Sequence, residues 1–353
     1  MITRAARRGG SPTVPSRFLQ RLKAFSGEEA FGAVTRRGAF YRDCALALEA
    51  PILSPALKRP GPKPHPPRFP GQLSVTAIET LMRDPYAIYA RHILKLDPLD
   101  DLAADPGAAE RGTLVHDVFG DFAKAFPDAL PADALGELLR RGEAKLAPTR
   151  RDFPQVFAAW WPRFKRMAKA YVAWEEERRA GGGLTILAEQ GGRLPLLLAD
   201  GSTFHLTARA DRIEMRGGQA AIIDFKTGTP PSDKEIFAGF APQLTLEAAM
   251  VLENAFKDFP RAAGIEELVY VHVTGGREPI RPRTVKTPKG RSESIEDIVA
   301  IHRANLVARI GDYREGRIGF HSKPHPKFTS DYGDYDHLAR VAEWMAAADE
   351  DEA

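Results

Sequence analysis

The order of the predicted elements indicates a mixed α/β fold of the type αβββαβ, wrapped by additional helices. Helical apolar spacing dominates residues 73–174, and short apolar runs with strand-like alternation follow over residues 184–225. One further helix and one returning strand come after them. The 353 residues are 43% hydrophobic and 27% charged, a composition that is typical of a globular protein with a sizeable core.

Local signals place the helices. Ser74 is in position to cap a first helix, which Asp84-Pro85 interrupts before apolar residues continue it to Leu94. A run of aromatic residues at helical spacing predicts a long helix over residues 157–174 that faces the core. Ser294 opens a later helix. The remaining helices are expected at about residues 109–126, 242–252 and 335–347.

The strands are predicted from runs of apolar and β-branched residues between turn signals. Gly217-Gly218 predicts a tight turn, which makes the strands on either side of it antiparallel neighbours. Asp211 is then expected at the end of one strand and Asp224 near the end of the next. The expected strands are Leu184–Gln190, Arg193–Leu198, Thr203–Arg209, Gln219–Phe225 and Glu267–Val273.

The first seventy residues differ from the rest. Residues 15–48 have helical periodicity, but their apolar side chains, among them Phe18, Leu22 and Phe25, are too few to form a core. A proline-rich stretch follows and predicts an extended linker. The expected parts are a helical region 1–50, a linker 51–70, a main domain 71–348 and a disordered acidic tail 349–353.

The pattern Asp224-Phe225-Lys226, thirteen residues after Asp211, carries the most chemical information. Strand alternation places Asp224 and Lys226 on one face and Phe225 on the other. Two carboxylates beside an ammonium suit a hard cation such as Mg²⁺, which completes its shell with water and phosphate oxygens. Lys226 would face the attacking water or the charge that develops on phosphorus. The pattern indicates metal-dependent cleavage of a phosphodiester.

A surface ion pair is the ordinary explanation of an Asp-x-Lys sequence at the end of a strand. Here the strand that contains Asp224, Gln219–Phe225, is mostly apolar and is therefore expected to be buried. An unpaired acid in a buried strand is costly. The metal interpretation is favoured for that reason.

Basic side chains gather in one segment between Gly276 and Arg291, which holds six of them, one acid and three prolines. A solvated loop and a strip that contacts DNA phosphates explain this segment equally well. The net charge of +3 does not separate the two. The six basic residues are Arg277, Arg281, Arg283, Lys286, Lys289 and Arg291.

The single cysteine, Cys44, excludes an intramolecular disulfide, a cysteine-based zinc site and an all-cysteine iron–sulfur cluster. No run of eighteen apolar residues is present, and the basic N-terminus lacks the apolar stretch of a secretory signal. We therefore expect a cytoplasmic protein with no membrane partner.

With these residues in view, the chain resembles the PD-(D/E)XK nucleases of the RecB type. Within them it is most similar to the C-terminal nuclease region of AddB, a subunit of alphaproteobacterial AddAB helicase–nucleases. The resemblance covers about residues 73–345, and the order of its motifs is specific. It rests on Leu73–Glu79 with Arg83–Ala90, Arg111–His116, Ala210–Ile213, Asp224–Gly228 followed by Pro242–Leu244, and Asp334–Val341.

The resemblance implies a restriction-endonuclease-like core and assigns roles to several residues. Asp211 and Asp224 would bind Mg²⁺, or Mn²⁺ in its place, with the Phe225 carbonyl as a third ligand. His116 would be a further ligand from the helical side. Lys226 would be the catalytic lysine.

Three of the polar candidates have ordinary explanations as well. A helix histidine such as His116 is by itself more often a satisfied surface or core residue, although its place before the two aspartates favours a ligand. Gln243 would hold the DNA backbone or order the site, and helix capping or core packing explains it nearly as well. Glu189, at the end of a predicted strand, is a weaker candidate for contact with the metal or with one of its ligands.

The chain departs from the family pattern at two positions. Many relatives have a cysteine where this chain has Asp84, with three more near the C-terminus, and these hold an iron–sulfur cluster; no such cluster is expected here. Glu247 occupies a position where relatives often have tyrosine, which leaves the detail of DNA contact open. The chain also lacks a Gly-x-x-x-x-Gly-Lys-Ser/Thr loop, so ATP hydrolysis is not expected from it.

The expected function is that of a magnesium-dependent DNA exonuclease module in double-strand break repair, acting on a strand that an AddA-like helicase–nuclease subunit unwinds. Residues 11–70 would then be the end of a preceding helicase-like region. A free-standing single-strand exonuclease of the same fold and a decayed binding module are the alternatives. Cleavage polarity, end preference and oligomeric state do not follow from the sequence.

Overall fold

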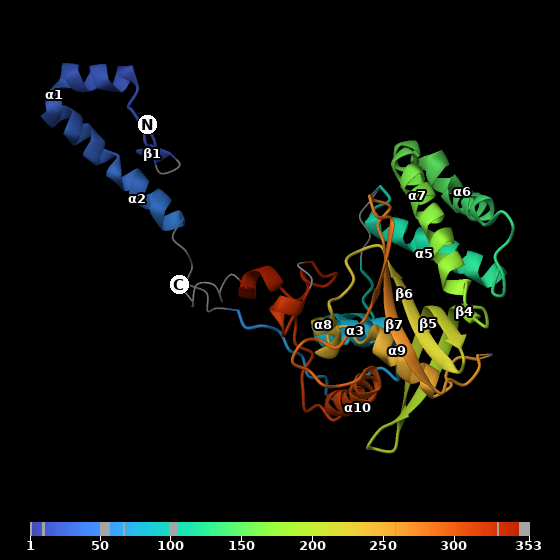
Figure 1. The fold of residues 1–353 in the computed structure, drawn as a ribbon. Coiled ribbons are helices and arrows are strands. Elements are labelled where there is room, and N and C mark those ends of the chain that lie inside the picture. Colours follow the sequence, from blue (N-terminus) through green and yellow to red (C-terminus); the bar gives the residue numbers. More distant parts are fainter. Residues whose placement is uncertain are drawn as a thin grey trace. The chain divides into compact units, whose positions relative to one another are not determined.

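The chain divides into two compact units, residues 1–57 and 58–353, which we describe separately (Figure 1). The predicted tail 349–353 and the part of the linker at 51–56 lie outside the described residues. The computed structural model describes residues 2–8, 11–49, 57–65, 68–98, 105–257, 259–329 and 332–345.

The smaller unit contains a short strand pair, β1 (Arg7–Arg8) with β2 (Ser11–Pro12), and two helices, α1 (Arg17–Arg37) and α2 (Ala39–Leu48). The helices lie where the sequence predicts them. Neither contains a buried residue, and the Phe25 side chain is 93% exposed. The apolar side chains of α1 and α2 therefore form no core within the described part of this unit.

The larger unit is built on a six-stranded mixed sheet with the strand order β3-β5-β6-β7-β8, in which β4 pairs with β5. The pairs β3–β5 and β6–β7 are parallel, and the pairs β4–β5, β5–β6 and β7–β8 are antiparallel. The strands are β3 (Gln72–Ser74), β4 (Thr185–Leu197), β5 (Thr203–Arg216), β6 (Gln219–Lys226), β7 (Gly264–Val273) and β8 (Ile280–Thr284).

The helices of this unit begin with a capped turn, because Ser74 accepts a hydrogen bond from the Ala77 N–H as predicted. Asp84-Pro85 ends the first helix, also as predicted. The helices are α3 (Val75–Arg83), α4 (Pro85–Ile88), the π-helix η1 (Tyr89–Ile93), α5 (Ala108–Ala125), α6 (Ala134–Asp152), α7 (Pro154–Arg179), α8 (Asp233–Phe237), α9 (Gln243–Leu252), α10 (Ile295–Arg314) and the 3₁₀ turn η2 (Pro326–Phe328).

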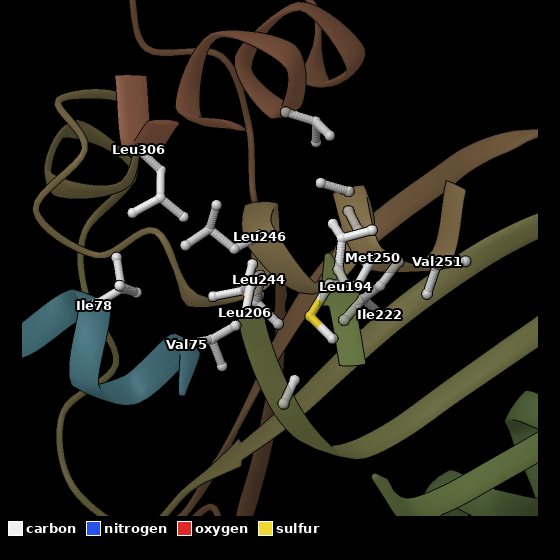
Figure 2. Packing of buried hydrophobic residues seen from close by; sticks show 14 of the residues in the cluster. Val75, Ile78, Leu194, Leu206, Ile222, Leu244, Leu246, Met250, Val251 and Leu306 are labelled. Carbon is white, nitrogen blue, oxygen red and sulfur yellow. The ribbon is translucent and has the colours of Figure 1, made fainter. Parts of the chain in front are cut away.

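Helices cover both faces of the sheet (Figure 1). On one face, α3, α9 and α10 pack with strand residues such as Leu206 and Ile222 (Figure 2). On the other face, α5, α6 and α7 pack with Ile223 and Phe225. Successive residues of β6 thus enter different cores, which makes β6 a strand buried on both faces. The mixed α/β architecture with flanking helices agrees with the predicted restriction-endonuclease-like fold.

Two predicted boundaries are wrong in the sheet. The two strands predicted between residues 184 and 198 are the single strand β4 (Thr185–Leu197), because β4 pairs with β5 from Thr185↔Met215 to Leu197↔Thr203. Pairing with β4 as far as Met215, and with β6 at Arg216, extends β5 well past Asp211, so Asp211 lies inside a strand and not at its end. The turn at Gly217-Gly218 is correct: its φ angles of 56° and 81° lie in the left-handed region that glycine adopts readily.

The C-terminal part also differs from prediction. Residues 334–340 form turns, and helical backbone is confined to 341–345 within the described part of the predicted helix 335–347. The proline-rich residues 58–65 pack on the segment around residues 320–322 near the C-terminus instead of forming a free linker. The Phe320 N–H donates to the Pro62 carbonyl at 3.0 Å, and the Ser322 N–H donates to the Pro60 carbonyl at 3.0 Å. Extended proline-rich backbone leaves its carbonyls free to accept such bonds.

Polar contacts tie the α3–α4 junction to the C-terminal segment. Asp84 Oδ1 accepts the Lys323 N–H at 3.1 Å, and Lys323 Nζ pairs with Asp336 at 2.7 Å. The Tyr335 hydroxyl donates to the Leu96 carbonyl at 2.6 Å. Ion pairs and hydrogen bonds therefore join the α3–α4 junction to the C-terminal segment.

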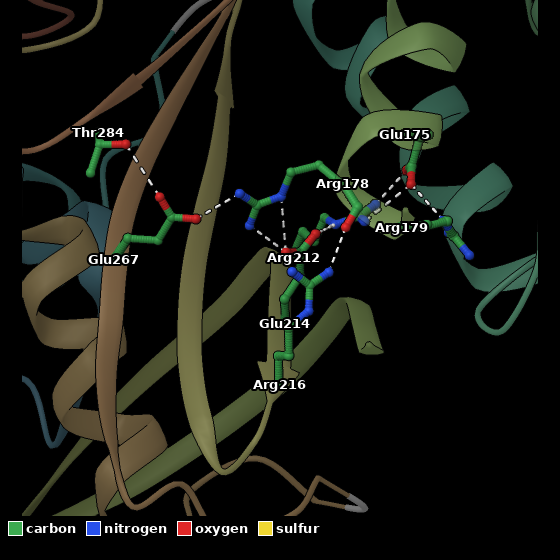
Figure 3. A network of polar contacts seen from close by, with 8 residues as sticks. All are labelled: Glu175, Arg178, Arg179, Arg212, Glu214, Arg216, Glu267 and Thr284. Carbon is green, nitrogen blue, oxygen red and sulfur yellow. Dashed lines mark hydrogen bonds and ion pairs between the residues drawn. The ribbon is translucent and has the colours of Figure 1, made fainter. Parts of the chain in front are cut away.

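A buried ion network connects α7 with β5 and β7 (Figure 3). Arg212, whose side chain is 1% exposed, pairs with Glu175 of α7 and with Glu214 on its own strand. Arg178 of α7 pairs with Glu214 and with Glu267 of β7. Acids and guanidinium groups alternate through the network, so each buried charge has an opposite neighbour.

Candidate active site

The site lies where β5 and β6 separate. Their last paired residues are Arg212 and Ile223, and beyond this point β6 continues in register with β7 only. The side chain of Asp211 fills the opening, because its Oδ2 accepts the Phe225 N–H at 2.9 Å. A carboxylate therefore replaces a backbone acceptor at the end of the β5–β6 ladder.

Strand alternation along the end of β6 places its side chains as the sequence predicts. Phe225 packs between α5 and α7, with its ring 5.8 Å from those of Phe119 and Trp174. Asp224 and Lys226 share the opposite side, where the Lys226 Nζ lies 2.9 Å from Asp224 Oδ2. Asp224 is 2% exposed, whereas the Lys226 side chain is 32% exposed, so the carboxylate is buried and the ammonium group still reaches solvent.

Gln243, the first residue of α9, binds both members of this pair. Its Oε1 accepts from Lys226 Nζ at 2.9 Å, and its Nε2 donates to Asp224 Oδ1 at 2.6 Å. The same Nε2 lies 3.3 Å from Glu247 Oε1, one helical turn later. Gln243 is 7% exposed and is thus a buried link between the Asp224–Lys226 pair and Glu247.

His116 reaches the site from α5. Its Nδ1 lies 3.1 Å from Asp211 Oδ2. Gly112, one turn earlier on α5, makes this approach possible, because a Cβ at that position would lie 2.7 Å from the Thr227 hydroxyl. The structure therefore brings His116, Asp211, Phe225, Asp224, Lys226 and Gln243 together around the end of β6, as the sequence analysis expected.

Electrostatics in the site favour the neutral forms of its acids. Burial, followed by the charge of Asp211, raises the pKa of Asp224 to about 7. Burial, followed by the charge of Asp224, raises the pKa of Glu247 well above its usual value. Burial opposes charge on His116 and Lys226, but nearby carboxylates outweigh it, so the pKa of each is raised. Negative charge is in excess.

These residues fit a divalent cation. In the described parts of the chain, no three His, Cys, Asp or Glu side chains are arranged as a finished metal-ligand set. Asp211 and Asp224 nevertheless lie near enough to raise the pKa of Asp224, and a cation between them would relieve that repulsion. With the Phe225 carbonyl, the donors are mainly oxygen atoms, which suit Mg²⁺ or Mn²⁺.

Glu189 does not end a strand as expected but lies inside β4, opposite Asp211, in a strained left-handed conformation with φ of 51°. Its carboxylate pairs with Arg209 at 2.7 Å, and α5 passes close over it at Gly120. Burial, followed by the charge of Asp211, raises the pKa of Glu189. Backbone strain beside an aspartate of the site is consistent with a functional constraint.

The sequence analysis assigned no role to two acids of the site. Glu247 is 1% exposed, and its Oε2 has no hydrogen-bond partner among the described residues. Glu79 of α3 pairs with Arg83 at 3.3 Å, and its charge contributes to the raised pKa of Lys226. Helical spacing could have placed Glu247 one turn after Gln243. Nothing in the sequence reveals that this carboxyl group is buried with one of its oxygen atoms lacking a hydrogen-bond partner among the described residues.

The predicted basic strip is divided by the fold. Its central part is strand β8, which pairs with β7. Arg281 pairs with Glu278 at 2.7 Å, and Arg283 is held by Asp233 and the Pro231 carbonyl. These arginines serve local structure, and the cations near the end of the strip are considered below.

A mixed sheet flanked by helices, with two carboxylates and a lysine where two central strands separate, defines a nuclease-type α/β domain. Residues 72–326 match the PD-(D/E)XK nuclease superfamily, and the chain belongs to this superfamily. Its members generally use divalent metal ions such as Mg²⁺, which agrees with the donor set described above. Among the described residues, no helix is long and apolar enough to cross a membrane.

Several Rickettsia proteins are similar to the chain. An uncharacterized protein of Rickettsia bellii (strain RML369-C) is 36% identical over 197 residues, which cover 54% of this chain and 23% of that protein. An uncharacterized protein of Rickettsia felis (strain URRWXCal2) is 32% identical over 243 residues, covering 67% of this chain and 28% of that protein. The chain thus spans about a quarter of the length of the curated relatives it matches.

One solved structure, "Crystal structure of SSO0001", matches 69% of this chain and 78% of its own at 14% identity, with a TM-score of 0.28. This likeness is too weak to inform the fold or the function.

Proposed function

We propose that the chain is a metal-dependent deoxyribonuclease module that hydrolyses phosphodiester bonds of a DNA strand unwound by a helicase partner. The observation that carries the proposal is the position of Asp211 and Asp224 at the β5–β6 divergence, with Lys226 beside them. The Lys226 ammonium lies 2.9 Å from Asp224, and Asp211 is fixed by the Phe225 N–H at 2.9 Å. Membership of the PD-(D/E)XK superfamily supports a nuclease of this kind.

Each residue has a distinct role in this proposal. Asp211, Asp224, the Phe225 carbonyl and His116 would hold Mg²⁺ or Mn²⁺, which supplies Lewis-acid polarisation of the scissile phosphate and a more acidic water. Gln243 orients Lys226 and Asp224 through its two short hydrogen bonds.

The reaction is ordinary phosphodiester hydrolysis. The oxygen of a water molecule bonds to phosphorus as the water loses a proton. The bond from phosphorus to the leaving sugar oxygen breaks, and the sugar oxygen takes up a proton. Lys226 stays charged because its pKa is raised, and its ammonium faces the charge that increases on the phosphoryl oxygens.

Loss of one carboxylate tests the catalytic part of the proposal. Asp224→Asn and, separately, Asp211→Asn should abolish cleavage of single-stranded DNA in Mg²⁺ or Mn²⁺, because each removes a charged ligand. Asp224→Asn should fold, because burial raises the pKa of Asp224 to about 7 and its neutral form is therefore accessible, and Asp211→Asn keeps a side-chain oxygen that can accept the Phe225 N–H. A gel assay with a labelled oligonucleotide measures cleavage, and Asp128→Asn, at an exposed position, is the matched control. Full activity in Asp224→Asn would contradict the assignment.

The wider context is a proposal of its own. The chain spans about a quarter of its curated relatives, and the described apolar side chains of α1 and α2 are unburied. Both observations support a nuclease module that works within a larger AddAB-like helicase–nuclease in double-strand break repair, with residues 1–57 docked on a helicase-like region.

Purification of the full chain from its own cells, followed by mass spectrometry, tests this context. Recovery of an ATP-dependent helicase chain in constant ratio, with duplex degradation that requires ATP, would support it. A chain recovered alone with full exonuclease activity would contradict it and favour the free-standing exonuclease.

A further inference from the structure

A hollow of about 660 Å³ lies beside α8, between the end of the basic strip and the turn η2. Four of the side chains that line it are basic: Lys234 of α8, Lys289 and Arg291 after β8, and Lys327 of η2. We call it the lysine hollow. Only Lys289 and Arg291 belong to the predicted strip, so the fold adds cations that are distant in sequence.

The charge in the lysine hollow is not neutralised locally. Among the described residues, Lys234, Lys289 and Lys327 form no ion pair or side-chain hydrogen bond, and all three are exposed. Arg291 pairs with Glu293 at 3.2 Å. The acid that lines the hollow, Glu235, already accepts from Ser232. Three ammonium groups therefore remain available to an anionic ligand.

The lysine hollow also presents an aromatic side chain. Phe328 lines it and stacks on Phe240, with ring centroids 4.2 Å apart and planes at 14°. Cations that track a backbone beside an aromatic ring are the usual elements of a surface that binds single-stranded nucleic acid.

Arg83 and Glu79 connect the lysine hollow to the candidate active site. Arg83 donates to the Phe328 carbonyl at 2.8 Å and the Phe240 carbonyl at 2.9 Å, and it pairs with Glu79 at 3.3 Å. Glu79 in turn acts electrostatically on Lys226. Ser232 of the hollow follows Lys226 by six residues, a span of at most ~20 Å. One short strand can reach both places.

We propose that the lysine hollow binds the phosphate backbone of the single-stranded DNA whose scissile bond lies at Asp211, Asp224 and Lys226. This inference rests on the proposed nuclease function and adds a second contact point for the strand. In this proposal Lys234 and Lys327 join Lys289 and Arg291 of the predicted DNA-binding strip, while Arg281 and Arg283 of that strip have local partners.

The test compares two triple variants of the full chain. Lys234→Gln, Lys289→Gln and Lys327→Gln together empty the hollow of ammonium groups. Lys58→Gln, Lys169→Gln and Lys257→Gln together remove the same charge at exposed positions outside both the hollow and the predicted strip. Binding of a labelled oligothymidine is measured by fluorescence anisotropy without divalent metal, over a range of salt concentrations. Circular dichroism melts check that both variants fold.

The hollow variant should bind at least about 10-fold more weakly at low salt, and its salt dependence should flatten by about 2 units, since each phosphate contact on a single strand contributes about 0.7. The control variant should stay close to wild type. An equal salt dependence of DNA binding in the two variants would contradict the proposal that the lysine hollow binds the strand, and would attribute binding to general surface charge. Binding is measured without cleavage, so the two proposals can fail separately. If the salt dependence differs between the two variants but the wild-type chain cleaves no DNA, the nuclease function is refuted while DNA binding at the lysine hollow is supported.

Discussion

Two buried charge clusters lie one residue apart on β5 and behave in opposite ways. Arg212 belongs to the ion network with Glu175 and Glu214, where acids and guanidinium groups alternate. Asp211 belongs to the candidate active site, where Asp224 and Glu247 add further acids and the partly exposed Lys226 supplies an ammonium group. The first cluster is balanced, and the second is not.

The pKa shifts separate the two clusters. In the network, Arg212 and the other partners of Glu175 outweigh burial, so the pKa of Glu175 is lowered and that of Arg212 is raised. In the site, burial and repulsion between acids raise the pKa values of Asp224 and Glu247. Folding therefore favours the ionised forms of Arg212 and Glu175 in the network and the neutral forms of Asp224 and Glu247 in the site.

Burial of charge is thus no sign of function by itself. In a paired network, attraction between opposite charges offsets the free-energy cost of removing them from water. An excess of buried acids has no such compensation, and folding alone does not explain it. A bound cation would explain that excess. The imbalance, more than the burial, distinguishes the candidate site from the structural network.

Breaking the network should have the largest effect on stability. Arg212→Met leaves Glu175 and Glu214 without their shared partner in a buried place, and we expect a loss of about 3–5 kcal/mol in the free energy of unfolding. Urea denaturation measures it. Arg193→Met on the neighbouring strand β4 is the control, because its side chain is exposed and forms no ion pair among the described residues, so the change should cost less than about 0.5 kcal/mol. Similar losses in both variants would mean that the network is not a stabilising unit.

Removing the lysine of the site should act on turnover instead. Lys226→Ala should lower the rate of DNA cleavage by roughly 10²–10³, as loss of one electrostatic group in an active site often does. The folded state should tolerate the change, since Asp224 can take up a proton near pH 7. Single-turnover kinetics and a thermal melt measure the two effects. Normal turnover with a lower melting temperature would make Lys226 structural.

Local rules were sufficient to predict much of the fold. The Ser74 cap, the break at Asp84-Pro85 and the Gly217-Gly218 turn each depend on neighbouring residues, and each is present. The facing of Asp224 and Lys226 follows from strand alternation in the same way. Such features need no knowledge of distant contacts.

Other features depend on contacts that the sequence does not reveal. Asp211 lies inside β5 because the ladder with β4 continues past it, and Glu189 opposite it takes a left-handed conformation. The lysine hollow joins residues from three segments that are far apart in the chain. The sequence pattern predicted two strands where the structure has the single strand β4, because the pairing with β5 that makes β4 continuous joins residues that are distant in the chain.

An effect that depends on pH is expected at Glu247, whose Oε2 has no hydrogen-bond partner among the described residues. Its folded pKa lies well above the usual 4.5, because of burial and then the charge of Asp224. Below about pH 4.5 the carboxyl group is protonated in both the folded and the unfolded chain, so it does not affect stability. Above that pH the unfolded chain releases the proton while the folded chain keeps it, and stability falls by up to about 1.4 kcal/mol per pH unit until the folded pKa is reached.

Glu247→Gln removes this penalty while keeping an acceptor for the Gln243 Nε2. The variant should match wild type at about pH 4 and become progressively more stable than wild type as pH rises above about 4.5, measured by urea denaturation at several pH values. Asp211, Asp224 and Lys226 also act on Glu247, so Glu247→Gln is compared with the same change in an Asp224→Asn background, where one of these charges is gone. A stability difference independent of pH in both backgrounds would show that Glu247 is ionised in the folded chain, and the site would then be closer to the balanced network than its geometry indicates.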